Sequence, residues 1–397
     1  MVCRDPRFVA ILALLAISFS NTSLAQTQTT KSPAVDNIGE LGRLLFFDPN
    51  LSRNGNQSCA SCHNPKHAFI DNHDNSVAGA VSIGDDGHSL GERNAATITY
   101  AQFTPEFHID TNGDHVGGFF RDGRETSLSD QAGRPILNPI EMGMLSKASV
   151  VERILENPVY VASFKKLFQP SIFSSVEQTY KAIEHSLSTF ERIKAIFAPF
   201  DSKYDRYLAG EYNMTKEEEL GRKLFFSGLH NCNTCHQLDQ FNVGFSETFS
   251  NYRFYNIGIP INTTVSDNSD KPAKHRDQGL LSHPEVSNTA LSGKFKVPTL
   301  RNIAVTGPYM HNGVFNELRT VLVFYNKYII RNKESQTNPE TGELWADPEI
   351  KDTIDLDLLK QGQPLFGGNI DAMLAFLLTL TDKRYEVLLK EKEVSDS

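Results

Sequence analysis

Two stretches of the chain repeat one pattern of apolar and polar positions. Glu40-Leu-Gly-Arg-Leu-Leu-Phe-Phe47 and Glu219-Leu-Gly-Arg-Lys-Leu-Phe-Phe226 agree at seven of eight positions. Apolar residues at i, i+3 and i+4 predict an amphipathic helix in each copy, and Thr215 with Glu218 predicts a capping box at the start of the second. Agreement this close favours an internal duplication over two unrelated helices.

A third apolar pattern at helical spacing runs from Val176 to Phe197 and predicts a helix that ends before Pro199. No run of alternating apolar and polar residues predicts a strand. We therefore expect an all-α fold, with a boundary between its two halves near residue 200.

The segments outside these patterns are polar. Residues 71–120 and 240–297 are rich in Gly, Asn, Asp and Ser, which is typical of long ordered loops. Within the second of them, Ile261–Gln278 is polar enough to be mobile. Arg331–Asp352 is a further polar insertion, and it carries Trp345, the only tryptophan.

Each copy of the repeated helix is followed closely by Cys-x-x-Cys-His. The motifs are Cys59-Ala-Ser-Cys62-His63 and Cys232-Asn-Thr-Cys235-His236, and they use four of the five cysteines. This is the attachment signal of a c-type haem, in which two thiols bind the haem covalently and the histidine binds its iron. A zinc site or a disulfide pair is the alternative for one such motif, but two motifs favour two covalent haems.

A helix that leads into a haem-binding turn is how cytochrome c domains begin. The repeat therefore predicts two tandem cytochrome c-like domains, residues 26–200 and 201–397, joined and covered by long ordered loops.

The N-terminus reads as a secretory signal over residues 1–25. Arg4 and Arg7 precede an apolar run, and Ser23-Leu-Ala25 is a small-x-small cleavage site. No later stretch reaches membrane-spanning length. We expect a chain exported to the periplasm, where c-type haems are attached.

The charge of the chain bears on its partners. The formal net charge is −9 for 397 residues, and this acidity argues against nucleic acid as a partner and permits docking to a basic protein surface. Neither the identity of the partner nor the oligomeric state can be derived from it.

With these motifs the chain resembles the bacterial di-haem cytochrome c peroxidase and MauG family over essentially all of its exported part. The resemblance also rests on Phe119-Phe-Arg-Asp-Gly-Arg124, on Pro135-Ile-Leu-Asn-Pro-Ile-Glu141, on Lys296-Val-Pro-Thr-Leu-Arg-Asn-Ile303 and on Thr306-Gly-Pro-Tyr-Met-His311. It implies that the first haem reacts with hydrogen peroxide and that the second stores and relays electrons.

The resemblance assigns Glu141 and Gln131 to the peroxide side of the first haem. A carboxyl group in a partly dry pocket has a pKa suited to taking a proton from peroxide and returning it to the leaving oxygen. Gln131 would orient the ligand or the acid, because an amide does not titrate near neutral pH. On residue type alone, Glu141 would be a surface residue in an Asn-Pro turn.

The ligand of the second haem separates two branches of the family. Cytochrome c peroxidases carry a methionine 17 positions after the proline that matches Pro308, and here that position is Tyr325. The MauG branch has a tyrosine there, and a phenolate stabilises oxidised iron whereas a thioether stabilises ferrous iron. The resemblance therefore favours Tyr325 as a ligand over the alternative of a core aromatic residue.

Further residues are assigned by the resemblance alone. Asn94, Thr306 and Pro308 match positions that hold a calcium ion between the haems, with oxygen ligands that suit this cation. His311 matches a histidine beside the second haem, and a core histidine is the equal alternative.

The chain departs from the family at two positions. Arg121 stands where the family often has a tryptophan between the haems, and an arginine is not readily oxidised. Asp86 stands where peroxidases carry a histidine that caps the first haem, and His88, two positions further on, is a weak candidate for that role.

Three functions compete. An electron carrier leaves Glu141 and Gln131 unexplained, and a cytochrome c peroxidase predicts methionine in place of Tyr325. A MauG-like enzyme explains all three residues: it forms high-valent haem iron with hydrogen peroxide and oxidises a side chain, such as tryptophan, of a periplasmic partner protein. Within that branch the chain is similar to MbnH-type proteins, which pair with periplasmic copper-binding partners.

Overall fold

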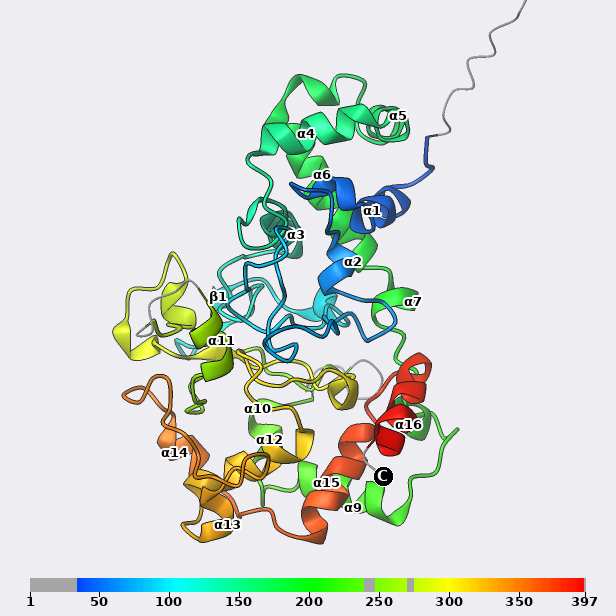
Figure 1. Cartoon of the computed structure of the whole chain (residues 1–397). Helices are drawn as coiled ribbons and strands as arrows, with labels where there is room; N and C mark the ends of the chain where they lie inside the picture. The colour runs from blue at the N-terminus through cyan, green and yellow to red at the C-terminus, as the bar shows by residue number, and fades with distance from the viewer. Residues whose placement is uncertain (1–33, 239–246, 270–274, 396–397) are drawn as a thin grey trace, which may run out of the picture.

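The computed structural model describes residues 34–238, 247–269 and 275–395, so the signal expected at residues 1–25 lies outside the described ranges. The described chain is rich in helices and has two small sheets (Figure 1). None of its helices is long and apolar enough to cross a membrane. The helices are α1 Ile38–Phe46, α2 Cys59–Cys62, α3 Leu128–Leu137, α4 Lys147–Glu156, α5 Pro158–Leu167, α6 Val176–Glu191, α7 Lys194–Phe197, α8 Lys203–Leu208, α9 Lys216–Phe226, α10 Cys232–Cys235, α11 Thr263–Asn268, α12 Leu318–Tyr325, α13 Lys333–Gln336, α14 Leu356–Leu359, α15 Gly368–Leu378 and α16 Glu386–Ser395.

The helices gather around two separate hydrophobic cores. One core is built from residues between Leu41 and Phe197, and the other from residues between Tyr204 and Leu380. In Figure 1, α1 and α3 to α6 lie at the top, α9, α12 and α15 lie at the bottom, and long loops fill the space between them. Along the chain, the first core thus ends at Phe197 and the second begins at Tyr204.

The duplicated helices pack in the same way in both halves. α1 lies against α6 and α9 lies against α15. At each crossing the repeated glycine allows the backbones to touch: a Cβ atom on Gly42 would lie 1.9 Å from the carbonyl oxygen of Ser186, and one on Gly221 would lie 1.8 Å from that of Ala372. Both repeated helices and the Thr215–Glu218 capping box are confirmed.

The prediction of one continuous helix from Val176 to Phe197 is wrong, because two helices, α6 and α7, cover this stretch. α6 ends at Glu191, and Ile193 adopts an extended conformation (φ −70°, ψ 100°) before α7 begins at Lys194. No proline or glycine causes the break. Ile193 instead packs against the first core, where it faces Gly39 of α1.

The long loops contain four two-residue strands. β1 (His108–Ile109) pairs antiparallel with β2 (His115–Val116), and His108 lies opposite Val116. β3 (Phe254–Tyr255) pairs antiparallel with β4 (Phe295–Lys296), and Phe254 lies opposite Lys296. The polar stretch at 261–278 contains α11, and its residues 270–274 lie outside the described ranges.

The polar insertion at 331–352 is anchored by its tryptophan. The indole of Trp345 is buried against the rings of Phe315 and Phe324, and its Nε1 donates a hydrogen bond of 2.8 Å to the carbonyl oxygen of Ser335. This insertion is therefore part of the second core.

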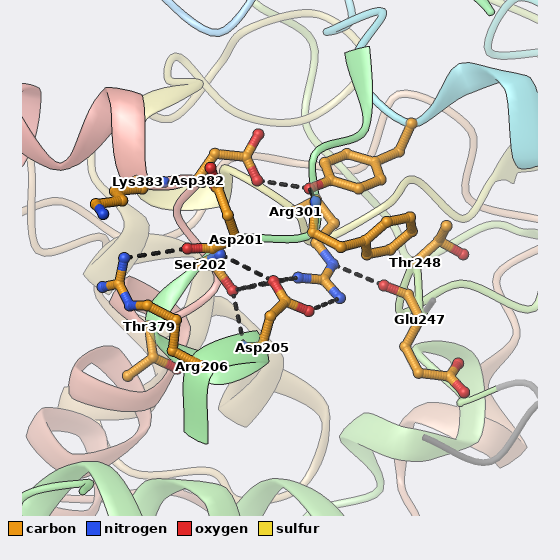
Figure 2. Close-up of polar contacts among 12 residues, drawn as sticks. Asp201, Ser202, Asp205, Arg206, Glu247, Thr248, Arg301, Thr379, Asp382 and Lys383 are labelled. Carbon is orange, nitrogen blue, oxygen red and sulfur yellow. Dashed lines mark hydrogen bonds and ion pairs between the residues drawn. The ribbon is translucent and has the colours of Figure 1, made fainter. Parts of the chain in front are cut away.

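A buried arginine joins the two halves. Arg301 donates to both carboxylate oxygens of Asp205 (2.6 and 2.9 Å) and to the carbonyl oxygen of Glu247 (Figure 2). Its guanidinium lies 5.3 Å from the ring centre of Tyr100, whose hydroxyl donates to Asp382. Residues far apart in the sequence, Tyr100, Asp205, Arg301 and Asp382, are thus held together.

Candidate functional site

A single cavity of about 860 Å³ joins the two Cys-x-x-Cys-His motifs. Every residue that the sequence assigns to the site lines this cavity: Cys59, Cys62, His63, Asn94, Gln131, Glu141, Cys232, Cys235, His236, Thr306, Pro308, His311 and Tyr325. The cavity is lined mainly by apolar groups, which suits flat hydrophobic cofactors.

The two motif histidines are fixed in the same way. Nδ1 of His63 lies 3.0 Å from the carbonyl oxygen of Phe69, and Nδ1 of His236 lies 2.9 Å from that of Phe249. A carbonyl accepts only from a protonated Nδ1, so each ring has Nε2 available to bind a metal. Burial lowers the pKa of both rings, to about 4 for His236, and this keeps the imidazoles neutral.

The four motif thiols are unpaired, so none is in a disulfide bond. Burial raises the pKa of Cys59, Cys62 and Cys235 to about 12 and that of Cys232 to about 11. In the described ranges, no group of three or more His, Cys, Asp or Glu residues is placed to hold a metal ion. Paired buried thiols, a fixed imidazole and an apolar cavity fit covalently bound haem in each half.

Glu141 and Gln131 lie on the side of the first motif. Gln131 is on α3, and Glu141 follows that helix in a turn closed by hydrogen bonds to the carbonyl oxygen of Asn138. Burial raises the pKa of Glu141, while Arg124 and Asn138 lower it. The negative charge of Glu141 is one of the causes that raise the pKa of the Cys62 thiol. The carboxyl therefore lies near the first haem attachment site. This is the environment of a carboxyl that can exchange a proton.

Tyr325 is the last residue of α12. It lies near the second motif, since the charges of Cys235 and Cys232 both help to raise the pKa of its hydroxyl. No described residue forms a hydrogen bond with that hydroxyl, and burial raises its pKa. Met310 and Met373 also line the cavity, and Met373 is fully buried in the second core. The structure thus brings Tyr325, Met310 and Met373 to the same cavity.

His311 is both a buried residue and a neighbour of the cavity. Its ring stacks on Phe295 at 3.8 Å, and Nε2 lies 3.2 Å from a carboxylate oxygen of Glu349. The carbonyl oxygen of His311 accepts from the backbone N–H of Asn94 at 2.8 Å, so this residue also connects the two halves.

The predicted calcium ligands already have partners. Arg121 donates from Nη2 to Oδ1 of Asn94 (2.8 Å) and from Nε to its carbonyl oxygen (3.1 Å). The hydroxyl of Thr306 donates to the carbonyl oxygen of Ile303 at 3.3 Å. The two oxygens of Asn94 therefore face a guanidinium, while Thr306 and Pro308 line the cavity.

His88 lies away from the cavity. Its side chain is 80% exposed, and it contacts Asp86 through both ring nitrogens. The structure therefore gives no support to His88 as a cap on the first haem.

Two buried groups of the cavity were missed by the sequence analysis. Glu191 lines it with a carboxylate oxygen that has no hydrogen-bond partner, and burial raises its pKa to about 8. Lys296 lines it as well, and burial lowers its pKa to about 7. The sequence does indicate that Glu191 is buried, because it lies four residues after Leu187 and eight after Ile183, on the apolar face of the helix. Nothing in the sequence indicates that Lys296 is buried.

Known proteins share this arrangement. A family model described as di-haem cytochrome c peroxidase matches residues 36–213. The chain is 46% identical over 387 residues to the methylamine utilization protein MauG of Paracoccus denitrificans, and the match covers 98% of each chain.

Solved structures extend the likeness to the fold. The Y463M variant of the diheme peroxidase BthA from Burkholderia thailandensis matches with a TM-score of 0.74 and 28% identity, covering 88% of this chain and 86% of that one. A MauG-like protein associated with microbial copper homeostasis matches with a TM-score of 0.63 and 29% identity, covering 89% and 93% of the two chains.

Proposed function

Because this chain belongs to the di-haem cytochrome c peroxidase family, we propose that it is a MauG-like enzyme that uses hydrogen peroxide to oxidise a side chain of a partner protein. Hydrogen peroxide takes up two protons and two electrons and becomes two molecules of water. The electrons come from the partner, for which tryptophan is the expected side chain. When bound, the two haems supply the redox chemistry that connects these half-reactions.

The observation that carries the MauG-like proposal is the phenol of Tyr325. It faces the shared cavity beside the second motif, without a hydrogen-bond partner among the described residues. Because the phenol lines the cavity, its oxygen is available there as a ligand of a bound metal ion. A phenolate ligand favours oxidised iron, so it suits an enzyme that withdraws electrons from a protein.

The first motif supports the peroxide step. We assign Glu141 to the transfer of a proton from one peroxide oxygen to the other, because its pKa is raised by burial and it lies near Cys62. We assign Gln131 to orienting the peroxide or the carboxyl. The role of Gln131 rests on the family resemblance and on its place in the cavity.

The proposal includes the organisation of the chain. Two cytochrome c-like domains, residues 26–200 and 201–397, are supported by the separate cores and by the repeated glycine contacts. Export to the periplasm by the signal at 1–25 is supported by the two haem-attachment motifs. Calcium is not included, because the oxygens of Asn94 accept from Arg121.

A second candidate is a cytochrome c peroxidase that takes its electrons from a small cytochrome. It is favoured by Met310 and Met373, which line the cavity, since a thioether ligand would make the second haem easier to reduce. The 46% identity to MauG over nearly the full chain favours the protein-modifying function.

The test compares the two electron donors. Peroxide is added to the haem-loaded enzyme with a reduced small cytochrome in one tube, and with the exported protein encoded by the neighbouring gene in another. We expect slow oxidation of the cytochrome and a peroxide-dependent mass change in the second protein, with the Glu141→Gln enzyme as the inactive control. Fast cytochrome oxidation without any mass change would overturn the proposal in favour of the peroxidase.

A further inference from the structure

Arg121 holds the residue that connects the two halves at the cavity. Its guanidinium donates to the side-chain oxygen of Asn94 at 2.8 Å and to its carbonyl oxygen at 3.1 Å. Asn94 is fixed in turn, because its backbone N–H donates to His311 and its Nδ2 donates to Ala80. Both oxygens of Asn94 therefore point at a cation that is part of the chain.

This cation has no carboxylate of its own among the described ion pairs. Asp122 is 2.7 Å from Arg93 and 2.9 Å from Arg124, and Asp277 is 2.6 Å from Arg93. Both of these carboxylates thus pair with other arginines. Arg121 is held by the neutral oxygens of Asn94, in the way that oxygen ligands hold a metal ion.

Two other basic side chains, Arg93 and Lys296, lie near Arg121. Burial is the main cause that lowers the pKa of Arg121, to about 10, and the charge of Arg93 lowers it further. Arg121 in turn contributes to the low pKa of Lys296, whose backbone N–H donates to the carbonyl oxygen of Arg121 at 2.9 Å. A divalent cation bound to the oxygens of Asn94 would lie against the guanidinium that they already contact, and that guanidinium would repel it.

We propose that the guanidinium of Arg121 is the resident cation of this junction and that the protein binds no calcium there. In this role Arg121 is a positioning residue, because it fixes Asn94 and, through Asn94, the contact with His311. The proposal does not require that the enzyme oxidises a partner protein, so its failure would leave the proposed function untouched.

The experiment measures calcium in the haem-loaded protein. After dialysis against calcium-free buffer, we expect less than about one-tenth of a calcium ion per molecule, and no heat of binding when calcium chloride is added to about 1 mM. Treatment with EGTA should leave the electron paramagnetic resonance signals of both haems unchanged. One calcium ion retained per molecule, or a signal altered by EGTA, would overturn the proposal.

A variant tests whether the guanidinium excludes calcium. Arg121→Gln removes the charge and leaves an amide beside Asn94, and it should bind about one calcium ion per molecule in the same titration. Arg319→Gln is the matched control, because Arg319 is half exposed and pairs with Asp371 on the surface; it should bind none. Failure of a folded Arg121→Gln protein to bind calcium would also count against the proposal, and the measurement on the unaltered protein stands if that variant does not fold.

Discussion

The contact between α9 and α15 can be tested at Gly221. In Gly221→Ala the new Cβ would lie 1.8 Å from the carbonyl oxygen of Ala372 and 2.8 Å from Cβ of Phe376. A Cβ atom essentially never lies closer than 3.0 Å to another heavy atom outside its own chain neighbours. The two helices must therefore separate by at least 1.2 Å, the difference between 3.0 and 1.8 Å. The obstacle is backbone, so no side-chain rotation can relieve it.

The cost follows from the packing that this separation disturbs. Inserting a methyl group into a well-packed core costs about 1–3 kcal/mol and sometimes more, and this crossing lies at the upper end because Phe225 and Phe376 are buried on either side. Alanine regains about 1 kcal/mol through its helix propensity. We expect a net loss of about 2 kcal/mol, which lowers the melting temperature of the second half by about 4–8 °C.

The assay is thermal unfolding of the haem-loaded protein, combined with electron paramagnetic resonance. α9 leads into the second haem motif, so Gly221→Ala should alter the signal of the second haem and leave the first unchanged. Gly42→Ala, where the Cβ would lie 1.9 Å from Ser186, should do the reverse. Gly228→Ala is the control, because nothing lies within 4 Å of its Cβ. Melting of Gly221→Ala within about 1 °C of Gly228→Ala would refute the steric argument.

Three further predictions concern the cavity. Glu141→Gln should keep both haems and slow the reaction with peroxide by about two to four orders of magnitude in stopped-flow absorbance. Tyr325→Phe should change the low-spin electron paramagnetic resonance signal of the second haem, because it removes the proposed ligand. Glu191, with a pKa of about 8 when folded and 4.5 as its ordinary value, holds a proton that the unfolded chain releases. Stability should therefore fall as pH rises from 5 to 8, and Glu191→Gln should remove up to about 4 kcal/mol of that fall.

Each of these has an outcome that contradicts it. An unchanged rate with peroxide would assign Glu141 to structure. An unaltered signal in Tyr325→Phe would remove the observation that carries the MauG-like proposal, and the cavity methionines would become the candidate ligands. Parallel stability–pH profiles for wild type and Glu191→Gln would show that Glu191 is ionised in the folded protein.

The duplicated helices could be predicted from sequence because the relevant signals are local. Periodicity and the Thr215–Glu218 capping box indicate where the helices lie, and the motifs indicate where the thiols and imidazoles lie. The sequence also repeats Gly42 and Gly221, but only the packing explains them, since the reason for each glycine is a carbonyl group more than 140 residues away along the chain. The break between α6 and α7 could not be predicted for the same reason, because it depends on the packing of Ile193 against the first core.

Arg121 shows most clearly where sequence reasoning stops. From the sequence, Arg121 matters because it stands where the family often has a tryptophan. Without that indole, electron exchange between the two haems is expected to be weaker. In the structure, the same residue brings a permanent charge to Asn94. Position 121 therefore bears on two properties: whether a side chain there can be oxidised, and whether the junction needs a metal ion. Only the first can be derived from residue type, because the second depends on which oxygens the guanidinium reaches. An enzyme of the proposed kind with arginine at position 121 would need another path for electrons between its halves. Tyr100, Tyr252, Tyr255 and Tyr309 line the same cavity together with Tyr325, and after an indole a phenol is the next side chain that is readily oxidised.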